Sequence, residues 1–259
     1  MRGTNSVPVI LTARDEQLFQ FLVDARVCDR EQIKAVAGFE STNRANDRLL
    51  RLVRAGVLKR FFIATRSGGV KALYCLSPRT ARRLSAPAAP IQRASDAVLI
   101  ADAFITHQLA VNDIHIGFCC KCPAKFGVLS IKWLHPKESL SPTVRVIPDG
   151  YVEVNRAAEC LPMFVEVDLG TESLSIWKSK IQGYIRLAAS GEFQELFGHS
   201  RFRVLVVVPS ERRQANVRKT VLSYTRKLFW FATLNDINSR GLFDPIWLRP
   251  DGDDRLPLL

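Results

Sequence analysis

The sequence predicts a mixed α/β protein of the α+β kind with two domains, and three observations lead to this prediction. The chain has 259 residues, which is enough for one small domain and one of ordinary size. Prolines among small residues at 85–95 (SAPAAPIQRAS) indicate a linker. Apolar spacing predicts three helices and a hairpin before this linker, and strands with helices after it. We therefore expect domains at 1–84 and 96–259.

The first 84 residues combine three helical patterns with a hairpin. Thr12 with Asp15, and Asp29 with Gln32, are capping pairs that begin the first two helices. The helices are expected at about 12–25, from Asp29 to Gly38, and from Ser41 or Thr42 to Gly56. Strand-like runs at 57–64 and 71–77 flank a turn at Ser67, Gly68 and Gly69. This order of elements predicts a winged helix-turn-helix.

The positive charge is concentrated in the first third of the chain. The formal net charge is +12 and the pI is about 9.8. Residues 1–90 hold 16 lysines and arginines against 7 acidic residues, a net charge of +9. This excess favours a polyanionic partner, and double-stranded DNA before an anionic membrane. We find neither a targeting segment nor the ~18 consecutive apolar residues of a membrane helix, so we expect a cytoplasmic protein with no membrane partner.

The start of the third helix carries the side chains expected to contact DNA bases. In a winged helix-turn-helix, the N-terminal residues of this helix enter the major groove. Asn43 suits adenine, and Arg44 suits guanine or a phosphate. Further cations are expected at the flanking backbone and minor groove, namely Arg48, Arg51, Arg54, Arg66 and Lys71. The alternative is a solvated basic face on a helical domain that binds protein.

Residues 96–259 predict a sandwich of helices and a sheet. A long helix at 96–118 precedes three consecutive strands, which implies an antiparallel meander. A helix, a buried strand, a second helix and a short strand then complete the order αβββαβαβ. The strands are expected at 128–134, 144–154, 162–169, 203–208 and 246–248, and the later helices at 173–189 and 211–232.

Three carboxylates stand at the ends of two neighbouring predicted strands. Glu166 and Asp168 are two residues apart, so both side chains point to one face of a strand, and Asp149 lies at the bend of the strand before. Carboxylates this close repel one another unless a cation neutralises them, and hard oxygen ligands select Mg²⁺ or Mn²⁺. Such an ion activates water and stabilises an attacked phosphodiester, so the cluster predicts phosphodiester hydrolysis.

Several segments of the chain resemble known families. The order of elements, Pro148-Asp149 and Glu166-x-Asp168 look like the PD-(D/E)XK nuclease fold, although Asp168 stands where that fold usually has its lysine. More specifically, residues 12–210 resemble the replication-relaxation family of plasmid and mobile-element proteins. The motifs that carry this resemblance are His107-x-Leu109-Ala110-Val111-Asn112-Asp113, Pro148-Asp149, Glu166-Val167-Asp168-x-Gly170-Thr171-Glu172 and Lys180-Ile181-x-x-Tyr184.

The resemblance implies a DNA-binding protein that acts in plasmid replication or DNA relaxation. It selects Lys180 as the lysine that positions or activates the attacking water. The apolar arc of its helix instead places Lys178 nearer the sheet; this arc consists of Leu174, Trp177, Ile181, Ile185 and Ala188. The implied site consists of Asp149, Glu166, Asp168 and Lys180, with the three carboxylates as ligands of Mg²⁺ or Mn²⁺. Other replication or mobilisation proteins, and a second copy of the chain in a homodimer, stay open as partners.

Two main functions remain open at this stage. One is a DNA-binding protein with a Mg²⁺-dependent nuclease or nickase domain, and the other is a non-enzymatic DNA-binding regulator with an inactive nuclease-like domain. A weaker third is a protein-interaction adaptor. Zinc is not expected at His115, Cys119, Cys120 and Cys122, because no second ligand pair completes a tetrahedral set.

Overall fold

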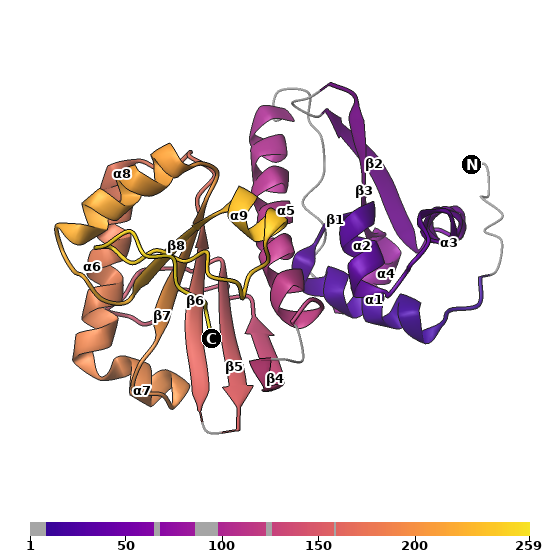
Figure 1. The fold of residues 1–259 in the computed structure, drawn as a ribbon. Coiled ribbons are helices and arrows are strands. Elements are labelled where there is room, and N and C mark those ends of the chain that lie inside the picture. The colour runs from indigo at the N-terminus through magenta and orange to yellow at the C-terminus, as the bar shows by residue number, and fades with distance from the viewer. Residues whose placement is uncertain (1–8, 65–67, 86–97, 123–125, 158) are drawn as a thin grey trace. The chain divides into compact units, whose positions relative to one another are not determined.

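The computed structural model describes residues 9–64, 68–85, 98–122, 126–157 and 159–259. The chain forms two compact units, Met1–Ile116 and Gly117–Leu259 (Figure 1). The first contains helices and a three-stranded sheet, and the second contains a five-stranded mixed sheet with its own helices. The fold is therefore α+β. Among the described helices, none is both long and apolar enough to cross a membrane.

Three helices of the first unit share one apolar core. They are α1 (Ala13–Ala25), α2 (Arg30–Val36) and α3 (Thr42–Arg54), and the prediction of all three is confirmed. Each begins at a polar residue; the carboxylate of Asp29, for example, accepts a hydrogen bond from the backbone N–H of Gln32 at 2.9 Å. Their inward side chains pack together, among them Leu18, Phe19, Leu22, Ile33, Leu49 and Leu52.

The small sheet of this unit contains the predicted hairpin and one more strand. β2 (Leu58–Ala64) and β3 (Val70–Leu76) are antiparallel, and β1 (Cys28–Asp29) pairs with the other edge of β3. Sequence analysis did not identify β1, because two residues are too few to show an alternating pattern. It also missed α4 (Pro78–Arg83), which begins at the cap residue Ser77.

The long helix α5 (Val98–Cys119) contacts the first unit through buried polar side chains. The Nδ2 of Asn112 donates to the carbonyl oxygen of Val27 at 2.7 Å. The Nε2 of Gln32 donates to the carbonyl oxygen of Leu109 at 2.8 Å and to Oδ1 of Asp113 at 2.7 Å. Residues up to Ile116 therefore belong with the first unit by their contacts.

Sequence analysis predicted this helix but grouped it with the second domain. Apolar periodicity shows that a helix is buried, yet it does not show which surface buries it. Of the predicted linker 85–95, only Ser85 lies within the described residues. The domain ranges 1–84 and 96–259 stay predictions.

The second unit is built on a mixed sheet. Its strands, in spatial order, are β4 (Val128–Leu134), β5 (Gly150–Arg156), β6 (Cys160–Val167), β7 (Arg203–Val208) and β8 (Phe229–Thr233). β4, β5 and β6 are antiparallel, as the predicted meander requires, whereas β6, β7 and β8 are parallel. The helices are α6 (Leu174–Ser190), α7 (Glu192–Phe197), α8 (Glu211–Leu222) and α9 (Leu234–Ser239).

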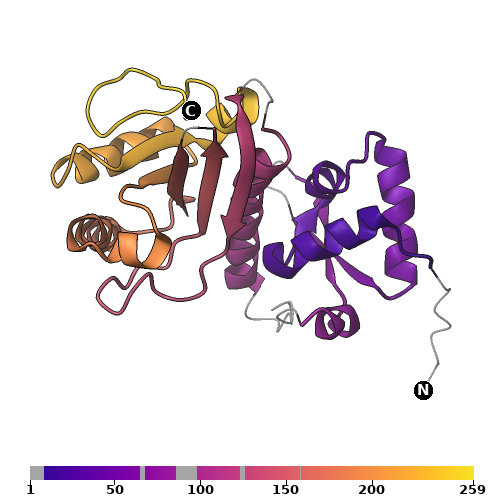
Figure 2. The same ribbon diagram turned by 90° about the horizontal axis from the view of Figure 1, so that it is seen from below.

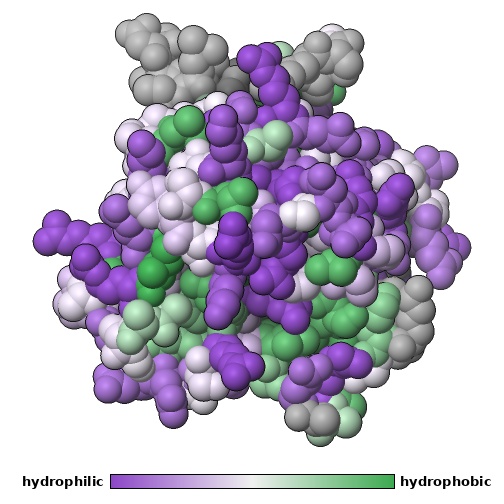
Figure 3. Space-filling view, turned by 60° about the vertical axis from the view of Figure 1, so that its left-hand side comes forward, coloured by the Kyte–Doolittle hydropathy of each residue, from purple (hydrophilic) through white to green (hydrophobic). Residues whose placement is uncertain are grey.

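Helices α6 and α8 lie on the same face of this sheet, as the orange segments of Figure 2 show. The core between them and the sheet includes Trp177, Ile181, Leu187, Val217, Val221, Phe164, Val206 and Phe231. The opposite sides of these helices are turned toward the viewer in Figure 3, where most residues are hydrophilic and the hydrophobic ones form separate patches. This packing holds α6 against the end of β6, where the predicted acidic residues lie.

Three predicted elements of the second unit were wrong in extent. The helix expected at 211–232 ends at Leu222, and its last residues form β8 instead. The strand expected at 246–248 makes only two isolated bridges, between Leu248 and Phe231 and between Trp247 and Leu256. The strand expected at 144–154 pairs only from Gly150 onward. A short apolar run such as Phe229–Thr233 fits either a helix or a strand, and pairing with β7 decides for the strand.

A buried ion pair joins α1 to α3. Asp15 is only 2% exposed, and the guanidinium of Arg48 donates to both of its oxygens, through Nε at 2.9 Å and through Nη2. Burial opposes ionisation of Asp15, but the hydrogen bonds from Arg48 and Thr12 and the charge of Arg48 outweigh it. The pKa of Asp15 is therefore held below its usual range.

We expect Asp15→Asn to destabilise the first unit by about 1–3 kcal/mol, because it removes charge-assisted hydrogen bonds. Hydrogen exchange of α1 and α3 amides measures this loss, and Asp24→Asn on the exposed side of α1 is the matched control. Since the native pKa is the lower one, the stabilisation is present above the unfolded value near 4. It is lost as the pH falls through the native value. Equal exchange in both variants at pH 7 would contradict this role.

Candidate nucleic-acid interface and acidic site

Helix α3 exposes one polar face because its apolar face is buried. Ala45, Leu49 and Leu52 are at most 1% exposed and belong to the core of the first unit. The hydroxyl of Ser41 caps the helix by accepting a hydrogen bond from the backbone N–H of Arg44. Helical geometry then turns the remaining positions outward. Four of the predicted contact residues are exposed there, namely Asn43, Arg44, Arg51 and Arg54.

Two other predicted cations are held by acidic partners within the first unit. Arg48 is bound to Asp15 and also donates to the carbonyl oxygen of Ile10 at 2.7 Å. The Nζ of Lys71 lies 2.9 Å from Oδ2 of Asp29. Arg48 thus has a structural role that its position in the sequence did not reveal, whereas Lys71 is still 46% exposed. Arg66 lies outside the described residues.

The hairpin adds two cations that sequence analysis did not select. Lys59 and Arg60 are exposed on β2, and the Arg60 guanidinium lies over the Phe62 ring at 5.4 Å from its centroid. Residues of α2, α3 and the hairpin, Arg60 and Phe62 among them, line a cavity of about 600 Å³. The signal available in the sequence was the pair of positive charges within a strand-like run. The exposed cations therefore extend from α3 to the hairpin.

In the second unit, Glu166 lies one residue before the end of β6 and is 1% exposed. Its Oε2 accepts a hydrogen bond from Nζ of Lys180 at 2.8 Å, and its Oε1 accepts one from the Tyr184 hydroxyl at 2.5 Å. The same Nζ donates to Oε1 of Glu172 at 2.6 Å. Lys180 therefore bridges one buried and one partly exposed carboxylate.

Asp149 is held against the same strand end. Its Oδ2 accepts a hydrogen bond from the backbone N–H of Val167 at 2.7 Å, and its own N–H donates to the carbonyl oxygen of Val165 at 3.0 Å. The next residue must be glycine, because a Cβ on Gly150 would lie 2.4 Å from Cζ2 of Trp133. The Asp149-Gly150 pair thus places a carboxylate beside β6 and lets the tryptophan ring approach the backbone.

Asp168 has different partners, although it too is 1% exposed. Its Oδ2 accepts hydrogen bonds from Nε1 of Trp177 and Nε of Arg213, both at 2.8 Å, and from Nη2 of Arg213. Its Oδ1 accepts one from the backbone N–H of Gly170 at 2.7 Å. Arg213 of α8 thus pairs with this carboxylate, and the predicted sharing of an ion with Glu166 and Asp149 stays a prediction.

Among the residues that the structure describes, the metal-ligating side chains that approach one another within 4.8 Å are Glu153, Cys160 and His199, not the three predicted carboxylates. The donor chemistry at the end of β6 nevertheless suits a hard cation. Lys180 donates to Glu166 and Glu172, the Asp149 carboxylate is held at the same strand end, and Oε2 of Glu172 is buried without a hydrogen-bond partner. Asp149, Glu166 and Glu172 are therefore the side chains that would hold Mg²⁺ or Mn²⁺.

Only one of the two candidate lysines reaches the acidic cluster. Lys180 reaches Glu166, whereas Lys178 is exposed. The predicted apolar arc had included Ile185 and Ala188, but the helix buries Tyr184 and Leu187 instead. This rotation of the buried face brings Lys180 to the sheet and turns Lys178 to solvent.

Burial and neighbouring charges both shift the pKa values of this cluster. Burial raises the pKa of Glu166 to about 7, with an opposing effect from Lys180 and a further rise from the Asp149 carboxylate. Burial alone would lower the pKa of Lys180, but the carboxylates of Glu166 and Glu172 more than offset it and raise the pKa above its usual value. Lys180 is therefore held in its charged form.

Sequence analysis missed four residues of this cluster as site residues. Glu172 and Tyr184 stand within the motifs that carry the family resemblance, so those motifs were the available signal. Trp177 appeared only as part of an apolar arc. Nothing in the sequence indicated Arg213, because it lies on another helix, 45 residues after its partner Asp168.

The fold and these side chains define an α+β protein that joins a basic helical unit to a mixed-sheet unit with a buried acidic cluster. The chain belongs to the replication-relaxation family, whose family model matches residues 19–199. No curated protein matches the sequence.

Two solved structures of the restriction endonuclease FokI show distant similarity. FokI bound to DNA is 11% identical with a TM-score of 0.35, over 89% of this chain and 45% of that chain. The other FokI structure is 14% identical with a TM-score of 0.33, over 85% of this chain and 41% of that chain. The chain thus spans less than half the length of either.

We expect Lys180→Met to destabilise the second unit by about 3–5 kcal/mol, because it leaves Glu166 buried without a counter-charge. All four tryptophans lie after residue 116, so the denaturant midpoint of their fluorescence reports this unit. Lys178→Met is the matched control on the same helix, and adding Glu166→Gln to Lys180→Met should restore part of the loss. Equal midpoints for the two single variants would show that the ion pair is not stabilising.

Proposed function

We propose that this protein binds duplex DNA through its first unit and acts in the replication of a plasmid or mobile element. In this proposal α3 is the recognition helix of a winged helix-turn-helix and the β2–β3 hairpin is its wing. The observation that carries the proposal is the row of exposed cations along α3, Arg44, Arg51 and Arg54, with Lys59 and Arg60 on the hairpin.

The charges of this surface support contact with a polyanion. Arg44, Arg51 and Arg54 form no ion pair with any described residue, so their charge is available to phosphates. Asn43 is exposed beside Arg44 at the start of α3, the part of a recognition helix that meets base edges.

We expect Arg51→Ala and Arg54→Ala to weaken duplex binding for all sequences and to reduce the slope of log K against log salt by about 1 each. Arg44→Ala should instead cost about 1–3 kcal/mol at the preferred site and relax sequence preference. Fluorescence anisotropy at several salt concentrations measures both effects. Arg226→Ala makes the same charge change on an exposed residue of the second unit and serves as control. If Arg226→Ala reduced the salt slope as much as Arg51→Ala and Arg54→Ala do, the proposal that α3 contacts DNA would be wrong.

A second candidate function is metal-dependent cleavage of DNA by the second unit. Its support is the convergence of Asp149, Glu166 and Lys180 at the end of β6. Bound Mg²⁺ or Mn²⁺ would lower the pKa of a coordinated water and stabilise the charge of an attacked phosphodiester. Lys180 would hold the leaving or attacking oxygen through its charge, and Tyr184 orients Glu166. Asp168 has a structural role in this proposal, because it ties β6 to α8.

We expect Mn²⁺- or Mg²⁺-dependent nicking of supercoiled DNA that falls below detection in Asp149→Asn and Glu166→Gln. Both variants should keep the DNA affinity of the first unit, since the two groups of residues lie in different units. Glu195→Gln, an exposed change in α7, is the control. Absence of nicking in the unsubstituted protein, on supercoiled, linear and single-stranded DNA, would reject cleavage and leave the DNA-binding proposal standing.

A further inference from the structure

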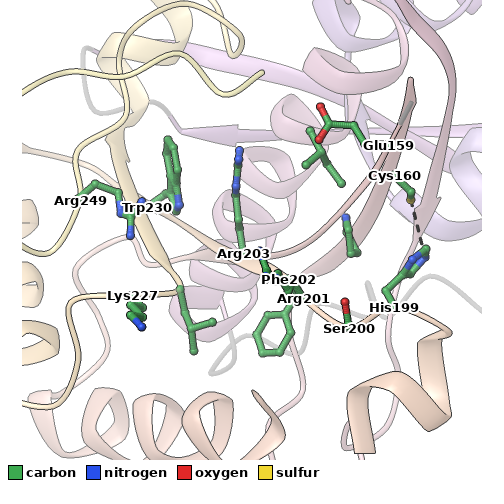
Figure 4. Close-up of a pocket in the computed structure, with 13 residues that line it drawn as sticks. Glu159, Cys160, His199, Ser200, Arg201, Phe202, Arg203, Lys227, Trp230 and Arg249 are labelled. Atoms are coloured by element: carbon green, nitrogen blue, oxygen red, sulfur yellow. Dashed lines mark hydrogen bonds between the residues drawn. The ribbon is translucent and has the colours of Figure 1, made fainter. Parts of the chain in front are cut away.

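Three metal-ligating side chains meet at the other end of β6, away from Glu166. The Nε2 of His199 lies 3.6 Å from Oε1 of Glu153 and 3.7 Å from Sγ of Cys160. All three ligand atoms lie within 4.8 Å of one another. Figure 4 shows Cys160 and His199 pointing toward each other at one side of a cavity.

Sheet register explains why two of these residues share a face. Glu153 of β5 is opposite Pro162 of β6, and Cys160 is two residues from Pro162 on the same strand. Residues two apart on a strand point to one side of a sheet, so the carboxylate and the thiol lie on the same side. His199 reaches them from the segment that follows α7.

We propose that Glu153, Cys160 and His199 bind one divalent ion of the zinc class. A tetrahedral zinc ion with bonds of about 2.0–2.3 Å keeps its ligand atoms roughly 3.3–3.7 Å apart. The two distances to His199 are already close to this range. A thiolate with an imidazole and a carboxylate selects Zn²⁺ or Co²⁺ rather than Mg²⁺. The proposal is independent of the DNA-binding and cleavage proposals.

Neighbouring side chains orient the carboxylate of this site. The buried Tyr151 hydroxyl donates to Oε1 of Glu153 at 3.0 Å, which is the kind of outer hydrogen bond that fixes a metal ligand. The Nζ of Lys132 lies 3.3 Å from both oxygens of Glu153. This lysine side chain is 55% exposed, so it moves to solvent at little cost when a cation neutralises Glu153.

The site has room for a fourth ligand. Cys160 and His199 line a cavity of about 650 Å³ that opens beside them (Figure 4). Its opposite side is basic, with the guanidinium carbons of Arg203 and Arg249 at 4.4 and 5.0 Å from the centroid of the Trp230 ring. Three protein ligands with an open fourth position are the pattern of a zinc site that accepts water or an anion.

The test uses the full-length protein freed of metal with a chelator and then titrated with Co²⁺. We expect one equivalent to give the near-ultraviolet thiolate-to-cobalt absorption band, and Zn²⁺ to displace it. Cys160→Ser should abolish the band, and Glu153→Gln and His199→Gln should weaken cobalt binding by about 10-fold or more. Cys122→Ser changes another partly exposed thiol and should leave the band unchanged.

Thermal unfolding gives a second test of metal binding that also works for variants that are less stable. Zn²⁺ should raise the Tm of the unsubstituted protein and of Cys122→Ser, because the metal binds the folded state, and should leave the Tm of Cys160→Ser unchanged. The proposal is overturned if the unsubstituted protein gives no thiolate band. It is equally overturned if Cys122→Ser removes the band and Cys160→Ser keeps it.

Discussion

The second unit depends on the neutralisation of two carboxylates buried at the end of β6. Glu166 and Asp168 are each 1% exposed, and a carboxylate buried without a partner costs several kcal/mol. Each receives a cation from a different helix, Lys180 from α6 and Arg213 from α8. The same helices pack their aromatic and aliphatic side chains on the sheet, so the ion pairs and the core favour the same orientation of α6 and α8.

Strand β6 is also where the sheet changes from antiparallel to parallel. It runs antiparallel to β5 and parallel to β7. For this reason the start of β5, with Asp149, and the end of β6, with Glu166, meet at one edge. The other end of β6 carries Cys160, which lies close to Glu153 and His199. The carboxylates at one end of the strand are therefore far in chemistry from the second cluster, which includes a sulfur and a nitrogen ligand.

The two units differ in the sign of charge that they present at their candidate sites. Arg44, Arg51 and Arg54 of α3 have no acidic partner among the described residues, whereas at the end of β6 the carboxylates of Glu166 and Glu172 share Lys180. A cluster with excess negative charge repels phosphates until a cation neutralises it. In the proposed function, affinity for duplex DNA would come from the first unit, and cleavage at β6 would require a bound metal ion.

The sequence by itself determined the local structure and the kinds of side chain available at the candidate metal site. Capping residues and apolar spacing predicted α1, α2, α3 and the β2–β3 hairpin, because these depend on interactions between residues close in the chain. The spacing of residues along predicted strands identified Asp149 and Glu166, whereas Lys180 was selected by the family resemblance, against the helix periodicity that favoured Lys178. Tertiary structure decided the rest. It turned Phe229–Thr233 into a strand through pairing with β7, and it engaged Arg48 with Asp15 and Asp168 with Arg213. These partners are 33 and 45 residues apart, and no periodicity in a sequence encodes which distant charge will neutralise a buried one.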